Sequence, residues 1–170
     1  MVRLPRLPGE RLRKRVTSTL NPNAEHQEQV RLFEWARLQW ALVPELRMLF
    51  AVPNGFHAPK HVRQWMVDEG MQAGMLDVVL AVPRLPFHGL YLENKAVTIR
   101  VNLTTGARTE DPGTVSAEQE GWMRALIEQG YAVDAQWSWE HSRDTILTYL
   151  RGGFVQRPVE ELVRYPGRNR

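Results

Sequence analysis

The amino-acid sequence predicts an α/β fold in which a central mixed β-sheet is flanked by helices. Apolar runs of strand length occur at 46–52, 76–82, 90–96 and 131–137, and segments with helical spacing of apolar residues alternate with them. The order of helix, strand, helix, hairpin, helix, strand and helix is typical of a sheet covered by helices. With 170 residues, 43% of them hydrophobic and 24% charged, the chain can form one well-packed domain.

The N-terminal third is predicted to hold an arm, a helix, a strand and a second helix. Residues 1–20 are rich in Arg and Pro without apolar periodicity, so we predict a basic flexible arm. The tripeptide Asn21-Pro22-Asn23 combines an Asn cap with a Pro suited to the first turn, and a helix follows to about Leu42. The run Leu46–Val52 predicts a strand, and His61–Glu69 predicts a helix that ends at a glycine.

The C-terminal half begins, after the hairpin, with a polar and turn-rich segment. Residues 98–115 are predicted to form an exposed loop or an extra hairpin. Ser116 and Gln119 have the spacing of a capping box that opens the next helix. After the last strand, Asp144–Leu150 predicts a short helix, and residues 153–170 predict a basic C-terminal tail.

The predicted hairpin carries charge in both of its apolar strands. In an antiparallel pair the numbers of facing residues sum to a constant, so a loop centred near Leu85 places Asp77 opposite Glu93. Lys95 lies two residues along on the same face. Because buried charge costs several kcal/mol, two facing carboxylates need a partner such as a metal ion. The spacing alone is equally consistent with a cross-strand ion pair at a sheet edge.

Composition narrows the chemistry of such a site. The chain has no cysteine, which excludes disulfides and thiolate ligands and favours a hard divalent ion held by oxygen ligands. The net charge of +3 is modest, but Arg and Lys concentrate at the two ends of the chain. Basic ends suit a phosphate backbone, although solvated tails have the same composition. No apolar run reaches the length needed to cross a bilayer, and no signal peptide is visible.

Six short motifs follow one another over the range from Glu25 to Leu150. They are Glu25–Gln29, Ala51–Gly55, Glu69–Arg84, Gly89–Lys95, Ser116–Gln119 and Glu128–Val133. In this order they resemble the VRR-NUC domain, a branch of the PD-(D/E)XK nuclease superfamily that occurs alone in phages and bacteria and as a module of larger repair proteins. Each motif is weak by itself, and the resemblance rests on their common order.

The resemblance implies a restriction-endonuclease-like core over residues 21–152, with the mixed sheet flanked by helices. It also implies a Mg²⁺- or Mn²⁺-dependent endodeoxyribonuclease that acts on branched DNA in the manner of a Holliday-junction resolvase, as a homodimer, in DNA repair or recombination. We expect a cytoplasmic location, in a bacterium or a phage-infected host. The alternatives are a nicking or non-specific nuclease of phage DNA processing, and a DNA-binding accessory protein that does not cleave.

The same resemblance assigns roles to the residues of the hairpin. Asp77 and Glu93 match the metal-binding acids of the family, and the backbone carbonyl of Asn94 matches a further ligand. Lys95 matches the lysine that orients or deprotonates the attacking water. Glu25 matches a glutamate of the first helix that contributes to the metal site. A divalent ion held by carboxylates activates water and stabilises the charge that develops during phosphodiester hydrolysis.

Further residues are expected to contact DNA. Gln119 matches a glutamine of the helix after the active-site strands, where it contacts phosphate or supports the catalytic residues. The expected DNA-binding residues are Asn54, His57, Lys60, Arg63, Arg13, Lys14 and Arg15. Two positions that are often lysine in the family are Val67 and Gln72 here, which weakens the expected basic surface. A zinc site at His57 and His61 is disfavoured because a proline lies between them and the protease glutamate is missing.

Overall fold

The computed structural model describes residues 17–21, 23–53 and 59–168, which form two β-sheets and several helices. The strands are β1 (Thr17–Thr19), β2 (Leu49–Ala51), β3 (Val78–Leu80), β4 (Leu90–Asn94), β5 (Val97–Asn102), β6 (Arg108–Pro112) and β7 (Ala132–Gln136). The helices are α1 (Ala24–Gln39), α2 (Lys60–Asp68), α3 (Ala117–Glu128), α4 (Trp139–Leu150) and α5 (Val159–Leu162), with 3₁₀ turns η1 (Pro44–Met48) and η2 (Pro166–Arg168).

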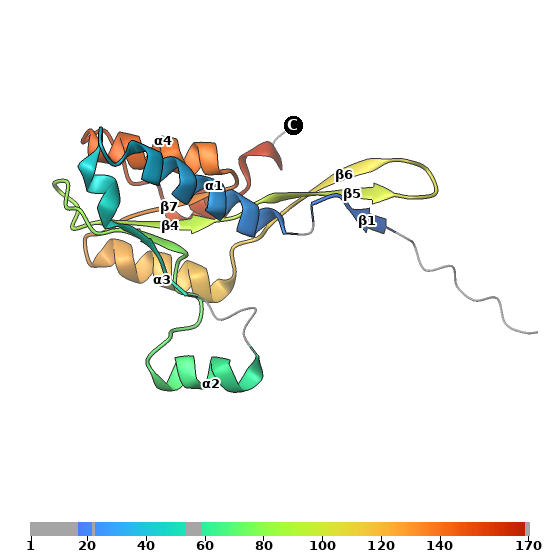
Figure 1. Cartoon of the computed structure of the whole chain (residues 1–170), viewed down its shortest axis with the longest axis horizontal. Coiled ribbons are helices and arrows are strands. Elements are labelled where there is room, and N and C mark those ends of the chain that lie inside the picture. Colours follow the sequence, from blue (N-terminus) through green and yellow to red (C-terminus); the bar gives the residue numbers. More distant parts are fainter. Residues whose placement is uncertain (1–16, 22, 54–58, 169–170) are drawn as a thin grey trace, which may run out of the picture.

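The larger sheet confirms the predicted fold class. Its strand order is β2-β3-β4-β7, and β4 pairs parallel with β7 whereas the other pairs are antiparallel, so the sheet is mixed. Helices α1 and α4 lie on one face and α3 on the other, while α2 stands apart from the sheet (Figure 1). No helix in the part of the chain that the structure describes is long and apolar enough to cross a membrane.

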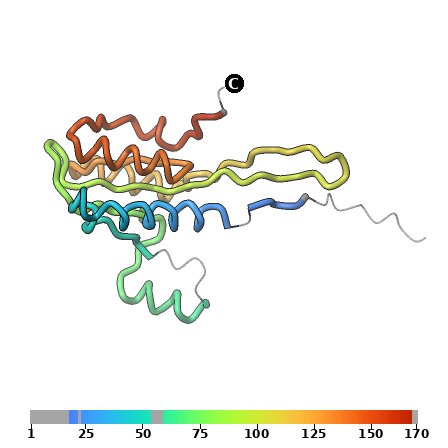
Figure 2. The backbone as a smooth tube through the Cα atoms, turned by 45° about the horizontal axis from the view of Figure 1, so that its top comes forward, coloured from blue at the N-terminus to red at the C-terminus, as the bar shows by residue number. Residues whose placement is uncertain are grey.

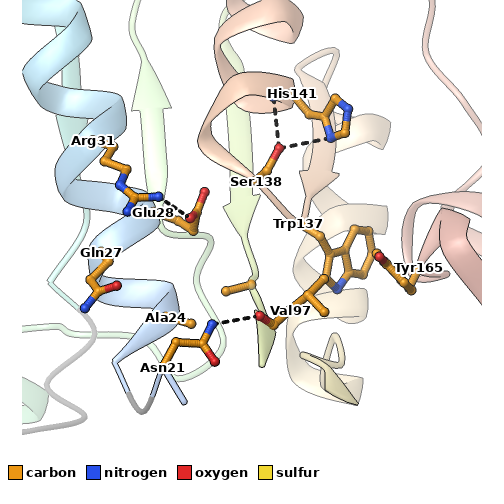
Figure 3. A pocket seen from close by; sticks show the side chains of 11 residues that line it. Asn21, Ala24, Gln27, Glu28, Arg31, Val97, Trp137, Ser138, His141 and Tyr165 are labelled. Atoms are coloured by element: carbon orange, nitrogen blue, oxygen red, sulfur yellow. Dashed lines mark hydrogen bonds and ion pairs between the residues drawn. The ribbon is translucent and has the colours of Figure 1, made fainter. Parts of the chain in front are cut away.

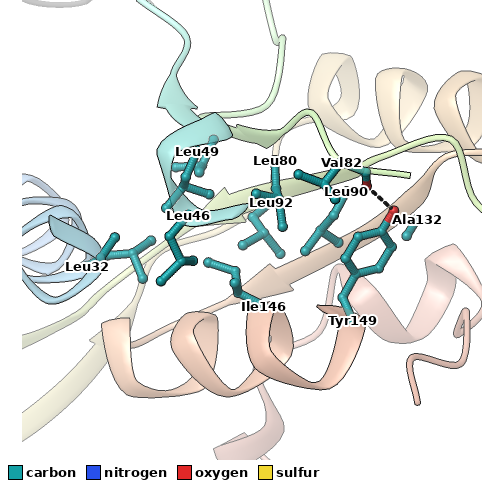
Figure 4. Close-up of a cluster of buried hydrophobic side chains, with 12 residues drawn as sticks. Leu32, Leu46, Leu49, Leu80, Val82, Leu90, Leu92, Ala132, Ile146 and Tyr149 are labelled. Atoms are coloured by element: carbon teal, nitrogen blue, oxygen red, sulfur yellow. Dashed lines mark hydrogen bonds between the residues drawn. The ribbon is translucent and has the colours of Figure 1, made fainter. Parts of the chain in front are cut away.

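Successive side chains of β4 point to opposite faces of the sheet, and each face has its own hydrophobic core. Leu90 and Leu92 point to the α1 and α4 side, where they pack with Ile146 and Tyr149 of α4 (Figure 4). On the other face, Val133 and the residues around it pack with α3. Residues of opposite parity on one strand therefore serve different layers, and the residues next to Leu92 point toward α3.

The register of the β3–β4 hairpin is the one that the sequence predicts. Val78 faces Leu92 and Leu80 faces Leu90, so the numbers of facing residues sum to the predicted constant. Continuing this register by one residue brings Asp77 opposite Glu93. The pairing therefore ends where the charged residues begin, at the edge of the apolar core.

The polar segment at 98–115 forms the extra hairpin rather than a loop. Strands β5 and β6 pair along their length and extend away from the body of the protein (Figure 2). β1 pairs with β5, with Thr17 opposite Asn102, so the last residues of the predicted arm belong to a three-stranded sheet. Residues 1–16 lie outside the described residues.

Two predicted boundaries differ from the structure in the N-terminal half. The prediction of an Asn cap is wrong, because α1 begins after Asn23 without a side-chain cap. Asn21 instead donates to the carbonyl of Val97 at 3.0 Å and accepts from the N–H of Ile99 at 3.0 Å, which ties the approach to α1 onto β5. The predicted strand 46–52 is shorter, because a 3₁₀ turn that starts at Pro44 extends into it.

The C-terminal region is more ordered than the predicted tail. α4 begins at Trp139, well before the predicted start, because Ser138 caps it through the N–H of His141. The segment after residue 153 packs on the domain, with Val159 and Leu162 buried. The side-chain amide of Gln156 donates to the carbonyl of Val133 and accepts from its N–H, at 3.0 and 2.8 Å.

An acidic side chain on β7 also holds this C-terminal segment. Asp134 is buried, and its Oδ1 accepts from Arg157 at 2.5 Å. Its Oδ2 accepts from Gln136 at 2.7 Å and from Thr145 at 3.0 Å. The arginine of the predicted basic tail therefore neutralises a carboxylate of the sheet.

Candidate active site

Five of the predicted site residues meet at the end of the β3–β4 hairpin, between α3 and the start of α1. Asp77 directly precedes β3, and Glu93 lies in β4 with Lys95 just after it. Gln119 comes from the first turn of α3 and Glu25 from the first turn of α1. Four separate elements therefore deliver side chains to one place.

Glu93 is the centre of the cluster. Its side chain is fully buried, and its Oε1 accepts from Gln119 at 2.5 Å and from the Lys95 ammonium at 2.8 Å. Its Oε2 is buried with no hydrogen-bond donor among the described residues. One oxygen of the carboxylate is therefore held from two sides, while the other has no donor.

The capping box of α3 fixes the orientation of Gln119. Ser116 accepts from the N–H of Gln119 at 3.2 Å, and the Oε1 of Gln119 accepts from the N–H of Ser116 at 2.8 Å. The amide group of Gln119 therefore turns its NH₂ toward Glu93. The capping box that the sequence predicts is confirmed, and one side chain both starts the helix and binds the central carboxylate.

Asp77 is held by the backbone of the neighbouring strand. Its Oδ2 accepts from the N–H of Asn94 at 3.0 Å. Asn94 is fixed in turn from the opposite face, where Ser142 of α4 donates to its Oδ1 at 2.7 Å. The Nδ2 of Asn94 is buried without a partner among the described residues.

The surroundings of Glu93 shift its ionisation. Burial raises the pKa of Glu93 to about 8, and the nearby charge of Asp77 adds to this, while Lys95 acts in the opposite direction. Burial by itself lowers the pKa of Lys95, but the charge and hydrogen bond of Glu93 outweigh it and raise the pKa above its usual value. Lys95 therefore stays protonated.

Glu25 approaches the site from α1 and remains largely exposed. Its Oε1 lies 3.9 Å from the Lys95 ammonium, and 57% of its side chain is accessible. Gly113, at the base of the β5–β6 hairpin, closes over this pair: a Cβ there would lie 2.9 Å from Glu25 Oε1 and 3.3 Å from Lys95 Cδ. The glycine allows the hairpin to pass close to both side chains.

The residues present suit a hard divalent cation. No group of three or more His, Cys, Asp and Glu side chains clusters within the described part of the chain. Asp77 and Glu93 nevertheless face each other, and Glu93 Oε2 is buried without a donor among the residues that the structure describes. A cation between two such oxygens would lower the pKa of Glu93 and satisfy this oxygen. The donor set is carboxylate oxygen, which Mg²⁺ and Mn²⁺ prefer.

Two of the predicted DNA-binding residues lie away from this cluster, and the others fall outside the residues that the structure describes. Lys60 and Arg63 are exposed on α2, a helix without a buried residue. Asn54, His57, Arg13, Lys14 and Arg15 fall outside the described residues. The structure thus gives an exposed position to two of the seven predicted residues.

Sequence reasoning missed two residues that support the site. The predicted helix Asp144–Leu150 does not include Ser142, yet Ser142 is buried on α4 and holds Asn94. Gly113 stood in a turn-rich segment with several turn residues, and nothing in the pattern linked it to Glu25. The Ser138 cap was the available signal for Ser142, because it moves the helix start and places Ser142 on the inner face.

Comparisons with known proteins support the same fold. No model of a protein family matches the sequence, and no curated protein matches it. Among solved structures, a protein described as a VRR_NUC domain protein superposes with a TM-score of 0.57 at 18% identity, over 76% of this chain and 90% of that chain. With the mixed sheet and its flanking helices, this likeness establishes that the chain has the fold of a VRR-NUC domain.

Proposed function

We propose that the protein is a divalent-metal-dependent DNA endonuclease that hydrolyses phosphodiester bonds. The observation that carries the proposal is the buried Glu93, which faces the carboxyl group of Asp77 and lies beside a lysine that stays charged. One oxygen of Glu93 has no donor in the described part of the chain. A cluster of like charge in a core costs folding free energy, and it is explained when a cation binds there during function. The nuclease-like fold of the structural neighbour agrees with this chemistry.

In this proposal Asp77 and Glu93 hold Mg²⁺ or Mn²⁺, with the backbone carbonyl of Asn94 as a further ligand. The ion supplies positive charge and an acidified water when bound. Gln119 and the N–H of Asn94 keep the two carboxylates in place. Glu25 completes the acidic rim of the site.

Lys95 is assigned to the scissile phosphate. Its ammonium donates to Glu93 and lies near Glu25, so it is held by carboxylates on two sides. Because its pKa is raised, it serves as a positive charge at the phosphate and orients the attacking water by hydrogen bonding. Removal of a proton from that water by Lys95 would require DNA or metal binding to lower this pKa.

The substrate that we propose is branched DNA, cut by a homodimer. Lys60 and Arg63 on the exposed α2, with His57 and Asn54 in the preceding segment, supply contacts to the duplex. Arg13, Lys14 and Arg15 add charge from the N-terminal segment. A two-fold dimer is the simplest arrangement for two symmetric cuts.

Cleavage assays with site variants test this function. Labelled linear, nicked, flap and four-way-junction DNA would be incubated with Mg²⁺, Mn²⁺ or chelator. Asp77→Ala and Lys95→Ala should each lower the cleavage rate about 10²–10⁴-fold. Glu34→Ala, which removes an exposed carboxylate of α1, should cut like the wild type.

The same assays separate the alternatives. Cleavage of linear DNA as fast as junction DNA would indicate a non-specific nuclease, and single cuts would indicate a nicking enzyme. Binding of DNA without cleavage at any metal concentration would indicate an accessory protein. Full activity of both site variants would remove the assignment of the catalytic cluster.

A further inference from the structure

A second concave site lies next to the catalytic cluster, between the start of α1, the start of α4 and the C-terminal segment. It is a pocket of about 440 Å³, and its lining includes Gln27, Trp137, His141 and Tyr165 (Figure 3). Ala24 and Ala96 also line it, and their chain neighbours Glu25 and Lys95 belong to the catalytic cluster. The pocket is therefore one residue removed from the catalytic side chains along two separate segments.

One wall of the pocket is aromatic and rigid. Trp137 is nearly buried, and its indole N–H donates to the carbonyl of Gly113 at 2.7 Å. Its ring packs against Tyr165 with 5.7 Å between the ring centroids. Gly113 also touches Glu25 and Lys95, so this wall is anchored to the backbone that closes over the catalytic pair.

The charged residues of the pocket neutralise one another. Glu28 accepts from the backbone N–H of Trp139 at 2.7 Å and from Arg31 at 3.2 Å. The carboxylate thus compensates both the start of α4 and the guanidinium. A free phosphate would meet this carboxylate, so the pocket does not suit an anion.

Neutral hydrogen-bonding groups remain available. Within the part of the chain that the structure describes, no side-chain hydrogen bond is formed by the amide of Gln27 or the hydroxyl of Tyr165. His141 uses Nδ1 toward Ser138 at 3.1 Å, which leaves Nε2. An amide, a phenol and an imidazole nitrogen beside two aromatic rings are the groups that recognise the edge and face of a nucleobase.

We propose that this pocket binds the base of one unpaired nucleotide of the DNA substrate, close to the scissile phosphate. The volume is within the range of small-molecule sites and accommodates one nucleoside. The base must be out of the duplex stack, because a paired base does not expose its edge to such a pocket. This inference rests on the proposed function, and it predicts a preference for flapped DNA, because a flap leaves a nucleotide unpaired.

Fluorescence of 2-aminopurine tests the pocket independently of cleavage. The probe would be placed at successive positions around the cut site in flap DNA, with Ca²⁺ in place of Mg²⁺ so that binding is followed without turnover. We expect one position to change its emission when the protein binds. The double variant Gln27→Leu and Tyr165→Phe keeps the shape and removes two hydrogen-bonding groups, and it should abolish that change and weaken flap binding about two- to tenfold. Gln129→Leu, an exposed amide at the end of α3, is the matched control.

The outcomes separate this inference from the proposed function. A position-specific signal that the double variant removes, in a protein that does not cleave, supports the pocket and overturns the nuclease. Cleavage of flap DNA with no signal at any position, or with equal signals in the double variant, overturns the pocket and leaves the nuclease. Equal affinity of wild type and double variant for flap DNA also overturns it.

Discussion

Two buried carboxylates on neighbouring strands of the sheet differ in how their oxygens are hydrogen-bonded. Asp134 on β7 accepts hydrogen bonds on both oxygens and is paired with Arg157. Glu93 on β4 has one oxygen without a donor among the described residues, and another carboxyl group faces it. Both side chains are inaccessible, so burial does not distinguish them. The hydrogen bonds of Asp134 account for its burial, whereas the burial of Glu93 is accounted for by the cation that we propose.

The largest predicted effect is a difference in cleavage rate between a variant of Glu93 and a variant of Asp134. In the proposed mechanism Glu93→Gln removes a metal-binding charge, so it should lower the cleavage rate at least about 100-fold at saturating Mg²⁺. Asp134→Asn should keep the rate within about threefold, because its partners are structural. Rates measured on flap DNA with folded protein check both values. Comparable losses in the two variants would contradict the distinction.

The next effect concerns the pH dependence of stability without metal. The pKa of Glu93 is about 8 in the folded protein and near 4.5, the ordinary value of a glutamate, when unfolded, so the folded state binds the proton more tightly. Stability from this group is present below pH 4.5 and is lost as the pH rises to 8, by up to about 5 kcal/mol. Urea unfolding in chelator from pH 5 to 8.5 measures the slope.

Glu93→Gln is the control for that slope, because glutamine does not titrate. The difference in unfolding free energy between wild type and variant should shift in favour of the variant as the pH rises. Added Mg²⁺ should stabilise the wild type most at high pH. A difference that is constant with pH would show that Glu93 does not carry the shifted pKa.

Removing the satisfied acid, Asp134, should have a smaller effect on stability. Asp134→Ala leaves Thr145 and Gln136 without their acceptor and frees Arg157, so we expect a loss of about 2–3 kcal/mol in unfolding free energy near neutral pH. Thermal or urea unfolding measures it. Arg157→Ala should cost less, since that side chain is partly exposed.

The smallest effect should come from the cap that positions Gln119. Ser116→Ala removes the acceptor for the N–H of Gln119 and should lower stability by about 1 kcal/mol. Because Gln119 also holds Glu93, the variant should lose activity beyond what its stability explains. Activity equal to that of the wild type, at a temperature where the variant is folded, would contradict the coupling.

The positions of several candidate site residues can be predicted from local sequence, whereas the hydrogen bonds of Asp134 cannot. The hairpin loop fixes the register, so the facing of Asp77 and Glu93 is predictable from residue numbers alone. The capping box predicts the start of α3 and with it the place of Gln119. Asp134 in the strand YAVDAQW gave no signal, because its partners Thr145 and Arg157 come from later segments whose packing the pattern does not reveal.

The errors have a common physical cause. Asn21 was assigned as a helix cap, but its side chain satisfies backbone groups of β5, a strand distant in sequence. The C-terminal segment was assigned as a tail from its charge, but Val159 and Leu162 bury against the body. Contacts with residues distant in sequence determine the structure at these positions, and a single sequence does not show those contacts.

The side-chain amide of Gln156 has a consequence for solubility. β7 is the last strand of its sheet, and an open edge invites pairing with a strand of another molecule. Gln156 occupies both the N–H and the carbonyl of Val133, as an added strand would. A chain shortened before this residue would expose a template for aggregation. The segment after α4 thus blocks part of the strand edge through which two molecules would pair.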